Sequence, residues 1–179
     1  FRTSGLVLGI VGYGRIGRML HKKVGSLGLA KVLVCDPFAD EAVVRSQGAE
    51  LTSLPELLEN ADIITLHIPM NEQTFNLLGD DEFRIMKSGA IIVNTSRGGV
   101  INQEALIKAL QSGRIRSAAL DVFEQEPLSA GNPLFTFPNV ICTDHTAYYS
   151  LESVKELKTR TARNVVRFFT QGHPDNPVN

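Results

Sequence analysis

The stretch Leu6–Gly17 constrains the fold more than any other part of the chain. A short apolar run ends at Gly12, and Gly12, Gly14 and Gly17 form a G-x-G-x-x-G pattern directly before an amphipathic segment. In such a junction the first glycine permits a tight turn, the second lets a pyrophosphate approach the backbone, and the third lets helix and strand pack closely. The following helix directs its free N–H groups and the positive end of its dipole at that pyrophosphate. The stretch therefore predicts a strand, a dinucleotide-binding loop and a helix.

An acidic residue stands where a dinucleotide-binding unit needs one. Lys31–Cys35 is typical of a second strand, and Asp36 follows it, 19 residues beyond Gly17. A carboxylate at this position accepts hydrogen bonds from the adenosine ribose and repels a 2′-phosphate, which favours NAD over NADP. No Arg or Lys occurs between Cys35 and Val44 to bind such a phosphate. The weaker alternative is a purely structural strand–turn–helix with a surface aspartate.

The composition is that of one ordinary globular domain. The chain has 179 residues, of which 43% are hydrophobic and 21% charged, and its formal net charge of −1 gives no electrostatic case for nucleic acid or membrane binding. No apolar run is long enough to span a bilayer, and no signal peptide is present at the start. Cys35 and Cys142 fall in expected strands without C-x-x-C spacing, which predicts buried, reduced thiols and a cytoplasmic location. No residue grouping has metal-ligand spacing, so no metal is expected.

Strand and helix patterns alternate along the chain, which predicts an α/β fold with a doubly wound, mostly parallel sheet of the Rossmann kind. We expect a single domain, residues 1–179, with helices on both faces and the strand order 3-2-1-4-5-6 plus an extra strand. The expected strands cover residues 6–11, 31–35, 49–51, 63–68, 90–94, 117–122 and 140–143. The expected helices cover 15–26, 40–47, a segment capped by Thr52 or Ser53, 80–86, 103–111 and 150–170.

The first helix has an expected inner face and an expected outer face. Hydrophobic spacing predicts an apolar side, and it predicts that His21 lies on the exterior of the helix. The residues expected on the apolar side are Ile16, Met19, Leu20, Val24 and Leu27.

Ionisable residues collect just after the strands, at the edge where ligands bind in such folds. The three that could form a reaction centre are Arg97, Glu126 and His145. Hydride transfer to or from nicotinamide needs a proton moved as well, and histidine titrates nearest neutrality. A carboxylate such as Glu126 would orient the imidazole, and Arg97 could hold a substrate carboxylate bidentately. Together these residues predict reversible reduction of a 2-oxo acid.

Each of the three also has an ordinary structural explanation. The histidine could be a hydrogen-bonded loop residue, Glu126 a turn acid before Pro127, and Arg97 a clamp on its own loop. Taken singly, the structural explanation is the better one for each. Taken together at the strand ends of a dinucleotide fold, they favour function. His67 is placed near the cofactor rather than in catalysis.

The residues resemble the D-isomer-specific 2-hydroxyacid dehydrogenases, the family of phosphoglycerate, glyoxylate, formate and D-lactate dehydrogenases and of the C-terminal-binding-protein corepressors. The resemblance covers essentially the whole chain. The motifs that carry it are Gly12-Tyr-Gly-Arg-Ile-Gly17, Asp36-Pro37, Leu66-His-Ile-Pro69, Val93-Asn-Thr-Ser-Arg-Gly-Gly99, Leu120-Asp-Val-Phe-Glu-Gln-Glu-Pro127 and Thr143-Asp-His145.

The resemblance implies roles for individual residues. Arg97 binds substrate, Glu126 supports the catalytic histidine, and His145 is the acid/base in hydride transfer between nicotinamide and a 2-oxo or 2-hydroxy acid. Around the cofactor, Arg15 and Ile16 meet the pyrophosphate, Asp36 the ribose, Thr74 a phosphate, residues 95–97 the nicotinamide side and Asp121 its carboxamide. The cofactor-binding set is Gly12, Tyr13, Gly14, Arg15, Ile16, Gly17, Asp36, Pro37, His67, Ile68, Pro69, Thr74, Thr95, Ser96, Arg97, Asp121, His145 and Ala147.

The sequence also departs from the family pattern. Asp144 stands where the family usually has a proline before the catalytic histidine, and Ala147-Tyr148-Tyr149 is nearest the corepressor and glyoxylate-reductase side. An additional carboxylate beside His145 could affect its titration or bend the loop. These departures leave the substrate open among 2-oxo acids.

The resemblance has consequences beyond the cofactor domain. It implies a substrate-binding domain made of segments before residue 1 and after about residue 173, so we expect this chain to be the cofactor-binding fragment, inactive or weak alone. It also implies a homodimer. The alternative function is an NAD-sensing protein-interaction module of the transcriptional corepressor type.

Overall fold

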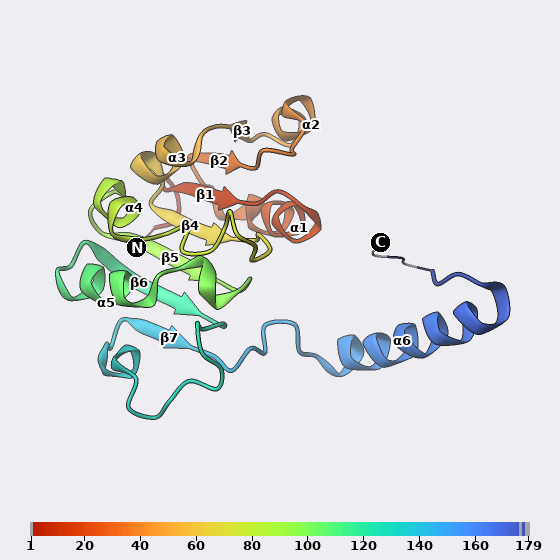
Figure 1. The fold of residues 1–179 in the computed structure, drawn as a ribbon. Coiled ribbons are helices and arrows are strands. Elements are labelled where there is room, and N and C mark those ends of the chain that lie inside the picture. The colour runs from red at the N-terminus through yellow and green to blue at the C-terminus, as the bar shows by residue number, and fades with distance from the viewer. Residues whose placement is uncertain (1, 176, 178–179) are drawn as a thin grey trace. The chain divides into compact units, whose positions relative to one another are not determined.

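The computed structural model describes residues 2–175 and residue 177. The chain divides into two compact units, Phe1–His145 and Thr146–Asn179, and each is described by itself. The first unit is built on one seven-stranded sheet in which every strand pair is parallel (Figure 1). The α/β class and the doubly wound sheet expected from the alternating pattern are confirmed.

The elements of the first unit follow the expected order with small changes at their ends. The strands are β1 (Val7–Val11), β2 (Lys31–Cys35), β3 (Glu50–Leu51), β4 (Ile63–Leu66), β5 (Ala90–Asn94), β6 (Ile115–Leu120) and β7 (Val140–Cys142). The helices are α1 (Arg15–Val24), α2 (Glu41–Ser46), α3 (Leu54–Asn60), α4 (Asp80–Ile85) and α5 (Gln103–Gln111), with short 3-10 turns η1 (Gly25–Leu27), η2 (Gly98–Val100) and η3 (Pro133–Thr136).

The strand order is β3-β2-β1-β4-β5-β6-β7, which confirms the expected order with one extra strand. Strand β1 pairs with β2 on one side and with β4 on the other. The direction of winding therefore changes between β1 and β4, and ligands of such folds bind at this switch point, beyond the carboxyl ends of the strands.

Two apolar clusters cover the two faces of the sheet. Because side chains alternate along a strand, Leu8 and Ile10 of β1 point into the smaller cluster, which includes Val44 of α2, whereas Val11 points into the larger one. The larger cluster is completed by α3, α4 and α5. Gly9 allows α3 to pack closely, because a Cβ there would stand 2.5 Å from Leu57. The expectation of helices on both faces is confirmed.

Helix α1 buries a face that only partly matches the one its hydrophobic spacing predicts: Leu20 and Val24 are partly buried, and Val24 packs against the smaller cluster. Its buried residues are Gly17 and His21, whereas Ile16 is 66% and Met19 55% exposed. The prediction that His21 lies outside was wrong. The helix approaches the sheet through the small Gly17, so the face that turns inward is the face that carries Gly17 and, one turn later, His21.

Asp62 joins the start of β4 to its neighbours. Its Oδ2 accepts a hydrogen bond from the N–H of Val7 at 2.8 Å, and its Oδ1 lies 2.8 Å from Nζ of Lys87. Burial raises the pKa of this carboxyl, but the hydrogen bonds from Lys87 and Val7 and the charge of Lys87 outweigh burial, so the pKa lies below its ordinary value. The bonds hold β1 and β4 in register at the end of the sheet away from the glycine loop.

The second unit consists of α6 (Leu151–Gln171) and the residues around it. Ser150 and Ser153 cap its start reciprocally, and Gly172 ends it in the left-handed conformation, which glycine adopts without strain. None of its residues is buried. In the part of the chain that the structure describes, no helix combines the length and the apolarity needed to cross a membrane.

The two cysteines depart from expectation in one respect. Cys35 and Cys142 are free thiols, but both are partly rather than fully buried. Burial nevertheless raises the pKa of both thiols.

Asp62 provides a test of how β1 and β4 are held. Asp62→Ala leaves the Val7 N–H without its carboxylate, and we expect the free energy of unfolding to fall by about 1–3 kcal/mol. Lys87→Met keeps the bond to Val7 and removes only a half-exposed ion pair, so we expect a loss of about 0–1 kcal/mol. Urea denaturation measures both, and equal losses in the two variants would contradict the importance of the backbone bond.

Two histidines should make stability depend on pH. Burial lowers the pKa of both His21 and His67 below the ordinary value of 6.5. The unfolded chain then binds more protons than the folded domain, so the free energy of unfolding decreases as the pH falls through 6.5 and levels off below the folded-state pKa values. Thermal melting between about pH 7.5 and about pH 5 should show this slope. We expect a shallower slope in His21→Asn and an unchanged one in His173→Asn, and a wild type without any slope would refute the idea.

Candidate active site

The glycine loop lies where three backbone segments come into contact. A Cβ on Gly17 would stand 2.2 Å from the carbonyl oxygen of Gly12, and a Cβ on Gly12 would stand 2.6 Å from that of His67. Gly12 also has φ of 91°, in the left-handed region. A Cβ on Gly14, by contrast, would meet no atom within 4 Å, so this glycine faces open space. The loop thus has the closed inner side and open outer side that a bound pyrophosphate requires.

Helix α1 begins at this open side without a side-chain cap. Gly14 is its N-cap and supplies no side-chain hydrogen bond, and Arg15 and Ile16 in the first turn are exposed. The first N–H groups of a helix have no partner within the helix and attract anions together with the helix dipole. This helix start therefore fits a dinucleotide pyrophosphate.

Asp36 is fixed by backbone N–H groups on both sides. Its Oδ2 accepts from the N–H of Tyr13 at 2.7 Å, and its Oδ1 accepts from the N–H of Phe38 at 2.9 Å. Each carboxylate oxygen can accept more than one hydrogen bond, so the group can still receive ribose hydroxyls. The side chain of Tyr13 itself is buried, so only its backbone reaches the loop surface.

A cavity of about 630 Å³ brings together four of the residues predicted to bind cofactor. It contains Asp36, Pro37, Ile68 and Thr74, and its apolar side includes Leu51, Leu54 and Leu77. An apolar slot beside a carboxylate fits an adenosine, whose base is apolar on its faces and whose ribose carries hydroxyls. The hydroxyl of Thr74 donates to the carbonyl of Pro69 at 2.7 Å, which makes this residue part of the turn that closes the slot.

A neighbouring cavity of about 330 Å³ adds a residue that the sequence argument missed. Arg18 of α1 lines it together with Asp36 and Asp40. The segment that follows Asp36 has no cation before Val44, whereas this arginine comes from the helix after the glycine loop. Two carboxylates face one guanidinium there, so the charge around the ribose stays unfavourable for a 2′-phosphate.

The loop after β5 is organised by a buried asparagine. Asn94 is 1% exposed; its side-chain N–H donates to the carbonyl of Arg97, and its Oδ1 accepts from the N–H and the hydroxyl of Ser96. The loop then packs against the loop after β6, because a Cβ on Gly98 would stand 1.9 Å from the backbone of Phe123. Arg97 is exposed, and one of its guanidinium nitrogens donates to the carbonyl of Ser96.

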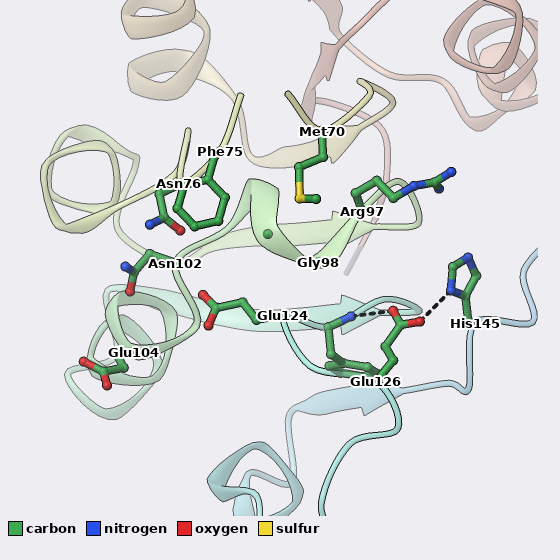
Figure 2. A pocket seen from close by; sticks show the side chains of 12 residues that line it. Met70, Phe75, Asn76, Arg97, Gly98, Asn102, Glu104, Glu124, Glu126 and His145 are labelled. Atoms are coloured by element: carbon green, nitrogen blue, oxygen red, sulfur yellow. Dashed lines mark hydrogen bonds and ion pairs between the residues drawn. The ribbon is translucent and has the colours of Figure 1, made fainter. Parts of the chain in front are cut away.

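His145 and Glu126 line the third cavity as a hydrogen-bonded pair. Nδ1 of the histidine lies 2.8 Å from Oε2 of Glu126, while Oε1 of Glu126 accepts from the N–H of Phe123 at 3.0 Å (Figure 2). These residues and Arg97 line one cavity of about 680 Å³. Figure 2 shows the three at one end of the pocket in this view, with Met70 and Phe75 farther along. The structure thus brings together the three residues predicted to form the reaction centre.

The protonation state of the pair follows from its contacts. The hydrogen bond from His145 lowers the pKa of Glu126, burial opposes this, and the Phe123 N–H and the histidine charge lower it further. A carboxylate only accepts, so Nδ1 of the ring carries a proton, and Nε2 is the nitrogen that can exchange one with a substrate.

His145 adopts a backbone conformation that is uncommon for a residue with a side chain. Its φ is 49°, and its N–H donates to the carbonyl of Asp121 at 2.8 Å. Asp121 is 4% exposed and accepts from the hydroxyl of Thr143 at 2.6 Å. Strained backbone of this kind is found at functional sites, where surrounding bonds maintain it.

The other predicted residues have more peripheral positions. The imidazole of His67 bonds the hydroxyl of Thr65 at 3.0 Å, which directs it back toward β4. Thr95 and Pro69 are exposed, and Ala147 belongs to the second unit. Asn94, Gly98 and Thr143 were not predicted as site residues. The only signal for them in the sequence is that they lie within the Asn-Thr-Ser-Arg-Gly and Thr-Asp-His motifs. Among the described residues, no three potential metal ligands converge.

Comparison with known proteins gives the same assignment as the geometry. The family model of the D-isomer specific 2-hydroxyacid dehydrogenase NAD binding domain matches residues 1–147. A glyoxylate reductase of Korarchaeum cryptofilum is 41% identical over 179 residues, which are 100% of this chain and 54% of that protein.

Similar solved structures support the same family assignment. A glyoxylate reductase from Paecilomyes thermophila has a TM-score of 0.92 at 30% identity, over 99% of this chain and 53% of its own. The holo form of D-mandelate dehydrogenase from Rhodotorula graminis has a TM-score of 0.90 at 36% identity. The match covers 100% of this chain and 53% of that one. The chain therefore spans about half the length of the relatives it matches. The glycine loop, the fixed Asp36 and the match over residues 1–147 lead to one conclusion: this chain belongs to the D-isomer specific 2-hydroxyacid dehydrogenase family, and it is the NAD-binding domain.

Proposed function

We propose that this chain is the cofactor half of an NAD-dependent dehydrogenase that interconverts a 2-oxo acid and a D-2-hydroxy acid. The observation that carries the proposal is the His145–Glu126 pair, which shares one cavity with Arg97. The pair and the arginine follow strand ends of the same sheet edge as the glycine loop. Family membership and the names of the matched relatives support the reaction class.

Substrate binding is assigned to Arg97. Arg97 is exposed, and the one hydrogen bond that its side chain makes to the described residues goes from the guanidinium to the neighbouring Ser96 carbonyl, which a substrate carboxylate can replace. A guanidinium offers two parallel N–H donors to a carboxylate, and this fixes the orientation of a 2-oxo acid. The positive charge also polarises the adjacent carbonyl group.

Proton transfer is assigned to His145. When bound, NADH supplies the hydride that reduces the carbonyl carbon of the substrate. Nε2 of His145 gives its proton to the carbonyl oxygen, and in the reverse direction it takes the proton from the hydroxyl. Glu126 keeps the ring oriented through Nδ1 and stabilises the imidazolium while the proton is held there. The reaction balances as 2-oxo acid, NADH and a proton giving 2-hydroxy acid and NAD⁺.

The remaining partners follow from the family. Since relatives are about twice as long, we propose that a substrate-binding domain supplies the other wall of the cleft. Such a wall excludes water and positions the substrate, and the 179-residue chain alone should bind NADH but turn over weakly. A homodimer remains a prediction. The corepressor-type module stays the alternative, and NADH binding without turnover of any 2-oxo acid by the intact protein would support it.

Substitutions at the reaction centre test the catalytic assignment. In the intact protein, His145→Asn should lower kcat about 10²–10⁴-fold, because it removes the acid/base group. Its dissociation constant for NADH should stay close to wild type. Glu126→Gln keeps a hydrogen-bonding side chain but loses the charge, so a smaller loss of kcat is expected.

A panel of 2-oxo acids, including glyoxylate and hydroxypyruvate, gives the readout through NADH absorbance. His173→Asn is the matched control and should retain wild-type kcat. Full activity of His145→Asn on every acid that the wild type reduces would refute the role of this histidine.

Asp36 tests the choice of cofactor. Asp36→Ser removes the charge-assisted bonds to the ribose, so binding of NADH should weaken about 10–100-fold. Binding of NADPH should strengthen at the same time, because repulsion of the 2′-phosphate is removed and Arg18 remains. Fluorescence titration measures both dissociation constants. Arg18→Ala added to Asp36→Ser should reverse the gain for NADPH, and an unchanged NADH/NADPH ratio in the single variant would contradict the assignment.

A further inference from the structure

A buried polar pair lies directly beneath the glycine loop. The hydroxyl of Tyr13 and Nδ1 of His21 are 2.7 Å apart, and their ring centroids are 5.9 Å apart. Tyr13 is 5% and His21 9% exposed. The buried residues that share this cluster with the tyrosine are all apolar: Leu8, Ile10, Val32, Val34, Val44 and Ala49.

A purely apolar pair would fill this space at lower cost. Burying a hydroxyl and an imidazole removes both from water, which is unfavourable unless they bond one another. Burial lowers the pKa of His21 and raises that of Tyr13, so the charged form of each group is disfavoured there. The two groups satisfy each other at the smaller apolar cluster, of which the Tyr13 ring is a member.

The pair connects the parts of the structure that must be held in place to receive a dinucleotide. Tyr13 stands between Gly12 and Gly14, and its own N–H donates to Oδ2 of Asp36. His21 stands on α1, whose uncapped N-terminus faces the open side of the loop. One residue of the loop is therefore bonded through its backbone to the end of β2 and through its side chain to α1.

Gly12 and Gly17 are packed against backbone, but the loop has no such contact at Gly14. Gly14 faces open space, and no side chain caps the start of α1. Glycine residues on both sides of Tyr13 give the loop little stiffness of its own. Tyr13 supplies the side chain by which the loop enters the smaller apolar cluster.

We propose that the Tyr13–His21 hydrogen bond is a positioning pair for cofactor binding, which holds the glycine loop and Asp36 in the geometry that receives the pyrophosphate and the ribose of NAD. Neither side chain touches the cofactor. The proposal rests on the proposed function, because it requires that this loop binds the cofactor.

Two substitutions remove the bond from opposite sides. Tyr13→Phe deletes one oxygen atom, and His21→Leu fills the space of the imidazole with an apolar side chain. In the intact protein, each should raise the dissociation constant for NADH about 3–10-fold, which is the worth of one net hydrogen bond. The KM for NADH should rise in parallel, whereas kcat at saturating NADH and the KM for the 2-oxo acid should stay at wild-type values.

A conservative variant distinguishes positioning from packing. His21→Asn places a side-chain oxygen near the position of Nδ1, where it can accept from the tyrosine hydroxyl, so it should restore most of the NADH affinity. Val32→Ala is the matched control, because Val32 lies in the same cluster but near the start of β2, at the other end of the strand from Asp36. It should lower the melting temperature and leave the dissociation constant for NADH unchanged.

The outcomes separate this proposal from the proposed function. If Tyr13→Phe and His21→Leu lower the melting temperature as Val32→Ala does but bind NADH as the wild type does, the pair only supports the core and the positioning role is refuted. If the wild type itself fails to bind NADH, the proposed function fails first. If His21→Leu does not fold, the other two variants still decide the question. Tyr13→Phe must weaken NADH binding, and His21→Asn must leave it close to wild type.

Discussion

The close approach of three backbone segments at the end of β1 is the constraint on which the rest of the structure depends. The carbonyl oxygen of Gly12 lies where a side chain on Gly17 would be, and that of His67 lies where a side chain on Gly12 would be. Helix α1, strand β1 and the residues after β4 can therefore meet without intervening side chains. This contact places the uncapped helix start beside Asp36. A methyl group at Gly17 would push α1 away from the end of β1, and one at Gly12 would push the end of β1 away from the residues after β4, because the backbone atoms that it would meet cannot rotate away.

The substrate side of the site is built by the same kind of contact. Gly98 lies against the backbone of Phe123, so the loop that carries Arg97 rests directly on the loop that carries Glu126. Buried Asn94 bonds both Ser96 and the carbonyl of Arg97, which fixes the course of the first loop. The arginine side chain can then stay exposed while its backbone is held. A rigid backbone with an adaptable charged end suits the substrate-binding role that we propose for Arg97.

These contacts explain which features could be predicted from the sequence. Strand order, the glycine loop and the strand-end residues follow from local backbone requirements and from the rule that parallel strands end at one edge, and all were predicted. The inner face of α1 was predicted only in part, because hydrophobic spacing favoured Ile16 and Met19, whereas the helix approaches the sheet through Gly17. His21 therefore turns inward, where Tyr13 satisfies it. Asn94 and Thr143 act through partners that only the folded chain brings together, so sequence spacing could not assign their roles.

The position of His145 is set by residues distant in sequence rather than by its immediate neighbours. Its N–H bonds the carbonyl of Asp121, its ring bonds Glu126, and Thr143 bonds the Asp121 side chain, so the ends of β6 and β7 together hold its left-handed backbone. A proline in place of Asp144 would fix its own φ and would also restrict the residue before it, Thr143. With Asp144 in place, the three bonds already fix the backbone of the segment from Thr143 to His145. A proline at residue 144 would only make that backbone more rigid. The departure from the family pattern at this position is therefore compatible with the acid/base role that we propose for His145.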